Sequence, residues 1–330
     1  QHQLGEWQPE ALSSMACLGG LYCSIGFYDH AEPLLEEALE GRQYVLGPEH
    51  PHPLLSVNTL SDLRCLQGQM EEALSLGIWA LEGRERSLGE EHLETLSSVN
   101  SVAGLYADLG RTKEAEAYFI RALQGRTRTL GTDHPHTLNS ATGLARLHQL
   151  QGHYEEAERL FTRVLEGHRN QQGGVHQYTL ISTSDLVGLY QSMNRFEEAE
   201  ALCLPTLQQF ETHFGAEHPL TLSLVNLLSA LYQSSGRFDM AEPLCRRALE
   251  HREEILGPDH PDTIISQHNL AWLQLYQRSD QAKPNFQQCL RSWANPTDWK
   301  HHWARLGLTL CDALDTGDFG PAETVLADLV

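Results

Sequence analysis

A period of 42 residues runs through the chain and constrains its fold more than any other feature of the sequence. A histidine, a glycine shortly before it, a second glycine and an alanine each recur at this spacing over six or seven cycles. The histidines are His50, His92, His134, His176, His218 and His260, with His302 continuing the series, and the upstream glycines are Gly5, Gly47, Gly89, Gly131, Gly173, Gly215 and Gly257. The second series is Gly26, Gly68, Gly110, Gly152, Asn194 and Gly236, and the alanines are Ala31, Ala73, Ala115, Ala157, Ala199 and Ala241. Such a period predicts an array of stacked structural repeats.

Each cycle has the pattern of two helices. In the third cycle, Leu96, Val99, Ala103 and Tyr106 form an amphipathic stripe that Gly110 ends, and Ala115, Phe119, Ala122 and Leu123 form a second stripe. The segment 130–135 then closes the cycle. Its glycine permits a turn, Asp133 is expected to cap the next helix, and Pro135 falls where a first helical turn tolerates a missing N–H. Alternation of Val, Ile and Thr is absent, so the sequence predicts helices and no sheet.

Small residues at one position of the first helix indicate how the pairs pack. These residues are Gly19, Ser61, Ala103, Ala145, Val187, Ser229 and Ala271. Two helices approach closely only where side chains are small, and one pair cannot bury its apolar face alone. We therefore expect an all-α solenoid, a right-handed superhelix of about seven to eight helix-turn-helix repeats. Residues 1–290 would form the array, and the Trp-rich residues 291–330 its last repeat or cap.

These patterns resemble tetratricopeptide (TPR) repeats. The small–small–Tyr phase of the first helix and the Gly…Ala…Phe/Leu…Ala phase of the second are the features shared with that family. The 42-residue period and the segments 226–232 (NLLSALY) and 256–261 (LGPDHP) resemble the kinesin light chain type in particular. The resemblance covers roughly residues 5–290 and implies a protein-interaction module.

The two ends of the sequence predict that the chain is part of a longer protein. Residue 1 is not Met, Leu4 and Gly5 already belong to the closing turn of a cycle, and residues 323–330 fall inside an expected second helix. Natural solenoids normally end in polar capping repeats.

The charge of the chain bears on its partners. Lys and Arg total 23 and Asp and Glu total 44, which gives a net charge of −21. A chain this acidic, without a basic cluster, repels phosphate backbones, so nucleic-acid binding is not expected. No apolar run approaches the ~20 residues of a membrane helix, and the N-terminus lacks an apolar secretory core. The sequence therefore predicts a cytoplasmic protein that does not insert into membranes.

The spacing of the histidines and cysteines does not indicate a metal-binding or catalytic site. Seven of the eighteen histidines lie on the 42-residue grid, where neighbouring repeats would hold them about 10 Å apart, too far to share an ion. The adjacent pair His301 and His302, the one cluster that departs from the repeat pattern, lacks a third ligand. No Cys-x-x-Cys, P-loop, G-x-S-x-G, G-x-G-x-x-G or His-Glu-x-x-His motif occurs. We therefore expect no metal, no cofactor and no catalytic site.

The concave groove that first helices line in TPR proteins is where a ligand is expected. Eight residues after each grid histidine stand Asn58, Asn100, Thr142, Ser184, Asn226 and His268. By resemblance to kinesin light chains, Asn58, Asn100 and Asn226 would bond the backbone of an extended peptide; the alternative is that they only solvate the groove. If they clamp a peptide, their side chains should point into open solvent. Expected neighbours on the same face are Asp62, Arg146, Gln149, Gln191, Gln233 and Trp272.

Three of the six tryptophans lie within eleven residues near the C-terminus. Trp293, Trp299 and Trp303 follow a point where the repeat slips by one residue, since Ala282 stands where position 283 is expected. They would either cap the last exposed helical face or form a docking surface.

The sequence therefore predicts a non-catalytic scaffold that binds a peptide or protein segment in its groove. Kinesin light chains bind acidic peptides through basic groove residues, but this chain places only Arg146 on that face. A neutral or basic partner suits its charge better. The alternative function is the repeat sensor or autoinhibitory arm of a larger signalling ATPase or effector enzyme, whose catalytic domain lies outside this chain.

Cysteine spacing generates a testable prediction. Cys23 and Cys65, like Cys203 and Cys245, are one period apart, beyond the ~7 Å Cα separation that a disulfide spans. Thiol titration of denatured, unreduced protein should find close to seven free thiols. Five or fewer would contradict a reducing compartment.

Overall fold

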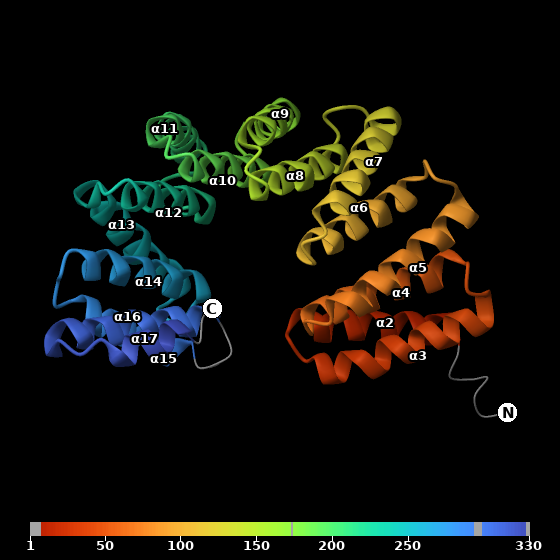
Figure 1. The fold of residues 1–330 in the computed structure, drawn as a ribbon, viewed down its shortest axis with the longest axis horizontal. Helices are drawn as coiled ribbons and strands as arrows, with labels where there is room; N and C mark the ends of the chain where they lie inside the picture. The colour runs from red at the N-terminus through yellow and green to blue at the C-terminus, as the bar shows by residue number, and fades with distance from the viewer. Residues whose placement is uncertain (1–7, 173, 294–298, 328–330) are drawn as a thin grey trace. The chain divides into compact units, whose positions relative to one another are not determined.

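A computed structural model describes residues 8–172, 174–293 and 299–327, and the described residues are helical throughout (Figure 1). Their sixteen helices contain 84% of them, and no strand occurs among them. The all-α repeat solenoid predicted from the period is confirmed. None of these helices combines the length and apolar character that crossing a bilayer requires.

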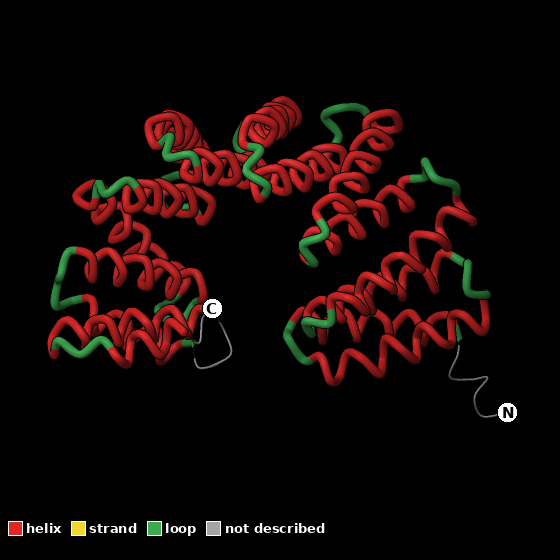
Figure 2. The backbone as a smooth tube through the Cα atoms, viewed as in Figure 1, coloured by secondary structure: helices red, strands yellow, loops and turns green. Residues whose placement is uncertain are grey.

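First and second helices alternate with constant lengths. The first helices have 16 residues each: α2 (Pro9–Ser24), α4 (Pro51–Leu66), α6 (Leu93–Asp108), α8 (Pro135–Leu150), α10 (Gln177–Ser192), α12 (Pro219–Ser234) and α14 (Pro261–Tyr276). The second helices have 19 each: α3 (Tyr28–Leu46), α5 (Met70–Leu88), α7 (Thr112–Leu130), α9 (Tyr154–Gln172), α11 (Phe196–Phe214) and α13 (Phe238–Leu256). Short loops join them (Figure 2). The chain ends with α15 (Ala282–Ser292), α16 (Trp299–Thr316) and α17 (Gly320–Ala327).

The array divides into two compact units. Unit 1 is Gln1–Gln171 and unit 2 is Gln172–Val330. Within each unit, successive helices pack against one another in chain order, as pairs and as stacks of pairs. The expected division into an array up to residue 290 and a separate cap is a different partition, and it stays a prediction.

Glycine is required where each second helix ends. Gly47, Gly89, Gly131, Gly215 and Gly257 have φ between 85° and 93°, with an extended ψ. This backbone region is essentially closed to residues with a Cβ. In the fourth such turn the positive φ falls on Gly174, while Gly173, like Gly5, lies outside the described residues.

The grid histidines are the N-caps of the first helices. The Nδ1 atoms of His50, His92, His134, His176, His218 and His260 each accept a hydrogen bond from the backbone N–H two residues on, at 3.2–3.3 Å. The expectation that Asp133 caps α8 is therefore wrong, because Asp133 accepts from the Thr132 hydroxyl instead. Pro135 does occupy the first helical turn, as predicted. His302 does not continue this role, since it lies inside α16.

Small residues fill the contacts between helices, as the sequence predicted. The grid alanines from Ala31 to Ala241, and Ala282 after the slip, are at most 1% exposed. Gly19 allows particularly close packing, because a Cβ there would lie 2.7 Å from the Leu35 side chain. All seven cysteines are free, and Cys203, Cys245 and Cys289 are buried as small core residues.

A buried arginine links three helices in most repeats, an arrangement that the sequence analysis missed. Arg126 on α7 donates to the Ser140 hydroxyl of α8 at 2.8 Å, to the His136 carbonyl at 2.9 Å, and to the Ser97 hydroxyl of α6 at 3.0 Å. Arg42 and Arg252 repeat this geometry with serines on both neighbouring first helices, and Arg84 bonds Ser98. Burial lowers the pKa of Arg126 to about 10 and lowers the pKa values of the other three.

One repeat has apolar side chains in place of the buried arginine and its two serine partners. At the positions of Ser97, Arg126 and Ser140, that repeat has Ile181, Phe210 and Leu224. Phe210 and Leu224 are buried in the same core cluster of unit 2. The exchange is concerted because an arginine without its acceptors, or serines without their donor, would leave buried polar groups unbonded.

This coupling generates a prediction for Arg126 and Ser140. Arg126→Phe alone should destabilise unit 1 by about 2–3 kcal/mol, since hydrogen bonds to a charged group contribute about 1.5–3 kcal/mol and the buried Ser140 hydroxyl loses its donor. Arg126→Phe with Ser140→Leu should recover at least about 1 kcal/mol relative to the sum of the single variants. Urea denaturation of the wild type, both single variants and the double variant measures this coupling. Strict additivity would contradict it.

Candidate peptide-binding face

The residues predicted to contact a ligand lie on the first helices of both units. We call the surface that these side chains share within a unit its first-helix face. In unit 1 it contains Asn58 and Asp62 of α4, Asn100 of α6, and Arg146 and Gln149 of α8. In unit 2 it contains Ser184 and Gln191 of α10, Asn226 and Gln233 of α12, and Trp272 of α14. Residues three, four or seven apart on one helix share a side of it, which is why these residues group together.

Two of the asparagines form contacts between repeats. Asn100 Nδ2 donates to Asn139 Oδ1 at 3.3 Å, and Asn226 Nδ2 donates to Ser266 Oγ at 3.2 Å. Their Oδ1 atoms are buried and have no hydrogen-bond partner within the described part of the chain. The expectation that these side chains point into open solvent is therefore wrong, because close stacking of first helices brings each amide against the next repeat.

Asn58 differs from the other two. With its amide oxygen turned toward Arg84, Asn58 accepts a hydrogen bond from Nη2 at 3.2 Å. Arg84 is 4% exposed, so this bond connects the first-helix face to the buried arginine beneath it.

The other predicted polar residues bond locally. Ser184 donates to the Leu180 carbonyl of its own helix at 3.0 Å. Gln191 donates to the Ser234 hydroxyl of the next first helix at 2.8 Å, and Gln233 contacts the Ser229 hydroxyl and the Cys245 sulfur at 3.4 Å. Arg146 is exposed and Gln149 is half-buried.

A pocket of about 250 Å³ opens on the first-helix face of unit 1, between α4, α5 and α6. It brings together Asn58 and Asp62, which the sequence predicted, with Gly104 and Asp108, which it did not. Gly104 occupies the position that Asp62 has one repeat earlier and Arg146 one repeat later. Comparing these grid positions would have shown the gap, because a missing side chain between two charged ones leaves space.

The two pocket carboxyls have raised pKa values. Asp62 and Asp108 both have solvent-exposed surface. The pocket walls nevertheless limit the hydration of their carboxyl groups, and this partial burial raises both pKa values above the ordinary range. Neither forms an ion pair within the described residues.

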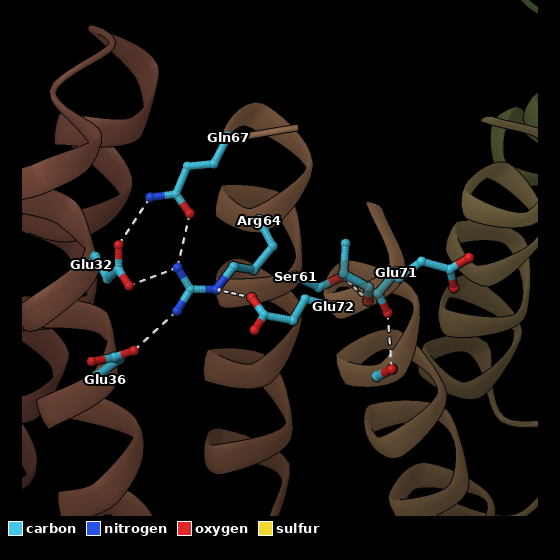
Figure 3. A network of polar contacts seen from close by, with 9 residues as sticks. Glu32, Glu36, Ser61, Arg64, Gln67, Glu71 and Glu72 are labelled. Carbon is cyan, nitrogen blue, oxygen red and sulfur yellow. Dashed lines mark hydrogen bonds and ion pairs between the residues drawn. The ribbon is translucent and has the colours of Figure 1, made fainter. Parts of the chain in front are cut away.

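Arg64 lies two residues after Asp62 on α4, a spacing at which two side chains of a helix face different neighbours. Figure 3 shows Arg64 among carboxylates of the adjacent helices. Its guanidinium lies between Glu32 (2.7 Å), Glu36 (3.1 Å) and Glu72 (3.1 Å). Hydrogen bonds from Gln67 and Arg64 lower the pKa of Glu32. The cation nearest in sequence to the pocket is therefore already paired with carboxylates of α3 and α5.

Trp272 belongs to an aromatic cluster in unit 2. Its Nε1–H donates to His268 Nε2 at 2.9 Å, and its ring lies 5.3 Å from the Phe286 ring and 6.0 Å from the Trp303 ring. Trp293, 9% exposed, packs beside His268. Burial lowers the pKa of His268 to about 4, so its ring is neutral near pH 7.

The predicted tryptophan cluster thus has both buried and exposed members. Trp293 is part of a core with Ile264, Phe286 and Cys289, which agrees with the capping alternative. Trp303 is 40% exposed. Trp299 begins α16, and its side chain lies outside the described residues.

Comparison with known families identifies the class of protein to which the chain belongs. The tetratricopeptide repeat family matches residues 10–86, 94–170 and 222–294, and a second tetratricopeptide repeat model matches residues 179–220. The chain belongs to the tetratricopeptide repeat family. No curated protein matches the sequence.

Solved structures show the same fold. TPR-like repeats from Podosopora anserina, described as those of a kinesin light chain, are 27% identical, with a TM-score of 0.56 over 62% of this chain and 98% of theirs. The quorum sensor NprR from B. thuringiensis is 14% identical, with a TM-score of 0.61 over 97% and 86%. A STAND protein with a tetratricopeptide repeat sensor from Pyrococcus horikoshii is 11% identical, with a TM-score of 0.61 over 96% and 47%. The chain therefore has kinesin light chain-like TPR repeats.

The neutral His268 generates a pH prediction. Its pKa is about 4 in the folded state and about 6.5 when unfolded, so the unfolded state binds more protons between these values and stability falls as the pH falls from 6.5 to 4. This histidine alone should cost up to about 3 kcal/mol at pH 4. His268→Gln keeps an acceptor for Trp272 but cannot ionise.

Urea denaturation followed by tryptophan fluorescence, at pH 7 and pH 4.5, should therefore show a smaller acid-induced loss for His268→Gln than for the wild type. His213→Gln, an exposed histidine of α11, is the control and should behave like the wild type. Equal losses for all three proteins would contradict the assignment.

Proposed function

We propose that the chain is a non-catalytic scaffold that binds a peptide or protein segment on its first-helix face. The observation that carries this proposal is the pocket of unit 1, where Asn58 and Asp62 line one cavity of about 250 Å³. A pocket with polar groups on a rigid helical array suits recognition of an extended chain, because α4 and α6 are held by their neighbours before the ligand arrives.

The repeated titratable residues support a binding role more than a catalytic one. The grid histidines cap helices, and the buried arginines bond serines and backbone carbonyls. These groups are occupied by structural hydrogen bonds.

Electrostatics favour a neutral or basic ligand. The chain has a net charge of −21, and the unpaired carboxyls of the first-helix face in unit 1 attract cations. An acidic peptide of the kind that kinesin light chains bind would meet repulsion there.

The alternative is a sensor role within a larger signalling protein. The STAND protein's repeats, which are named as a sensor, share the fold of this chain. An adjoining P-loop domain in the full-length sequence would favour the sensor, and an adjoining heptad coiled coil would favour a transport adaptor.

The asparagines provide the test of the scaffold proposal. Phage display of an unbiased peptide library against the whole chain selects a ligand, whose affinity is then measured by fluorescence anisotropy. Asn100 and Asn226 are half-buried, and each amide nitrogen donates one of its two N–H groups to the next repeat, so the other N–H is the group that would bond a ligand. Asn100→Ala and Asn226→Ala should therefore each weaken binding by roughly fivefold, about 1 kcal/mol for one lost hydrogen bond. Their stability should change by less than about 1 kcal/mol, since each loses one bond to the next repeat but also removes a buried acceptor without a partner.

Gln124→Ala on α7, an exposed amide outside the first-helix face, should leave affinity unchanged. Binding of a selected basic peptide should also weaken with added salt. A large fall in melting temperature with intact binding would show that the asparagines only connect repeats. Selection of no specific peptide would overturn the scaffold proposal.

A further inference from the structure

The pocket on the first-helix face of unit 1 has a floor made of small residues. A Cβ on Gly104 would contact nothing within 4 Å, so this position opens directly to free space. Gly77 on α5 lies at the base, where a Cβ would be 3.1 Å from Leu105. Larger residues at these two positions would fill the cavity.

The polar lining of this pocket suits a cation. Asp62 and Asp108 stand on adjacent first helices, and the pocket serines and the Asn58 amide add further polar groups. Arg84, the arginine beside the pocket, donates to Asn58 and Ser98, and its ion pair is with Glu94 at 3.8 Å, so among the described residues it is not paired with Asp62 or Asp108. Arg64 is paired with Glu32, Glu36 and Glu72 (Figure 3), so it does not pair with Asp62 either.

Exposed leucines occupy the equivalent position before and after Asp108. Leu66 ends α4 and is 52% exposed, and Leu150 ends α8 and is 79% exposed. Three consecutive repeats thus present Leu, Asp and Leu at the last residue of their first helices. A ligand with a positive charge between apolar groups complements this order.

We propose that this pocket binds the side chain of a lysine or arginine from an extended partner segment, with apolar ligand residues against Leu66 and Leu150. The charged end of the side chain lies between Asp62 and Asp108, and its aliphatic stem passes over Gly104. This proposal rests on the proposed scaffold function and specifies its ligand: a basic-apolar segment, in contrast to the acidic peptides of kinesin light chains.

The test uses the whole chain and two capped peptides, Ser-Leu-Ser-Lys-Ser-Leu-Ser and its analogue with glutamine in the centre. Isothermal titration calorimetry at low ionic strength should show that the wild type binds the lysine peptide about tenfold tighter, as one favourable charge contact of about 1.4 kcal/mol gives. The double variant Asp62→Asn, Asp108→Asn should lose this preference. It should remain folded, because burial disfavours the two charges that it removes.

A matched control distinguishes an effect of the two pocket carboxyls from an effect of the overall negative charge of the chain. The double variant Glu37→Gln, Glu114→Gln removes two exposed carboxylates from α3 and α7 and should keep the preference for lysine. A second pair of variants tests the space without changing charge. Gly104→Leu should weaken the lysine peptide at least about tenfold, and Gly188→Leu, at another helical glycine with open space around its Cβ, should not.

Equal affinity of the wild type for both peptides would overturn the pocket proposal, and so would equal losses in the pocket and control variants. Either result leaves the scaffold function standing if library selection yields peptides that bind elsewhere on the first-helix faces. Failure of both seven-residue peptides to bind also overturns the pocket proposal, while only a failed library selection overturns the scaffold function.

Discussion

The structure depends on the requirement that every helix pair bury its apolar and polar groups against the next pair. The buried arginines show this most directly. Arg126 reaches from a second helix to serines on the first helices of its own repeat and of the following one. Where Phe210 replaces the arginine, Ile181 and Leu224 replace the serines. The interface between repeats therefore accepts either a polar or an apolar set of side chains at these positions. Exchanging one member alone is costly, because it leaves a buried polar group without its partner.

The same constraint explains why chemically suggestive residues in this chain are structural. A histidine in every cycle invites a metal hypothesis, yet the six grid histidines from His50 to His260 each cap a helix by accepting a hydrogen bond at Nδ1, which leaves the ring proton on Nε2. The features that distinguish one repeat from another lie where the period is broken. Gly104 between Asp62 and Arg146 opens a pocket, and His268 in place of an asparagine supports an aromatic cluster with Trp272. Departures from the repeat are thus where recognition can be specific.

The helical array was predictable from the sequence, and the details of the face were not. Spacing alone located the helices and the turns, because a glycine with positive φ and a small residue at a helix crossing have few substitutes. The cap was assigned wrongly to Asp133, since aspartate and histidine at adjacent positions can both accept from the first helical turn. Asn100 and Asn226 were expected in solvent, but the distance between stacked first helices brings their amides to Asn139 and Ser266. That distance is set by the packing of the repeats and cannot be derived from the 42-residue period.

The sequence by itself determined the repeat unit, the order of its helices and the residues that must be small, since these follow from a 42-residue spacing and local backbone preferences. The tertiary structure alone decided which polar groups are consumed between repeats and which are left for a ligand. Arg64 and Asp62 are two residues apart, yet one is surrounded by carboxylates and the other lines a pocket with Asp108. The reason is geometric: positions two apart on a helix face different neighbours, and only stacking of the repeats determines what those neighbours are.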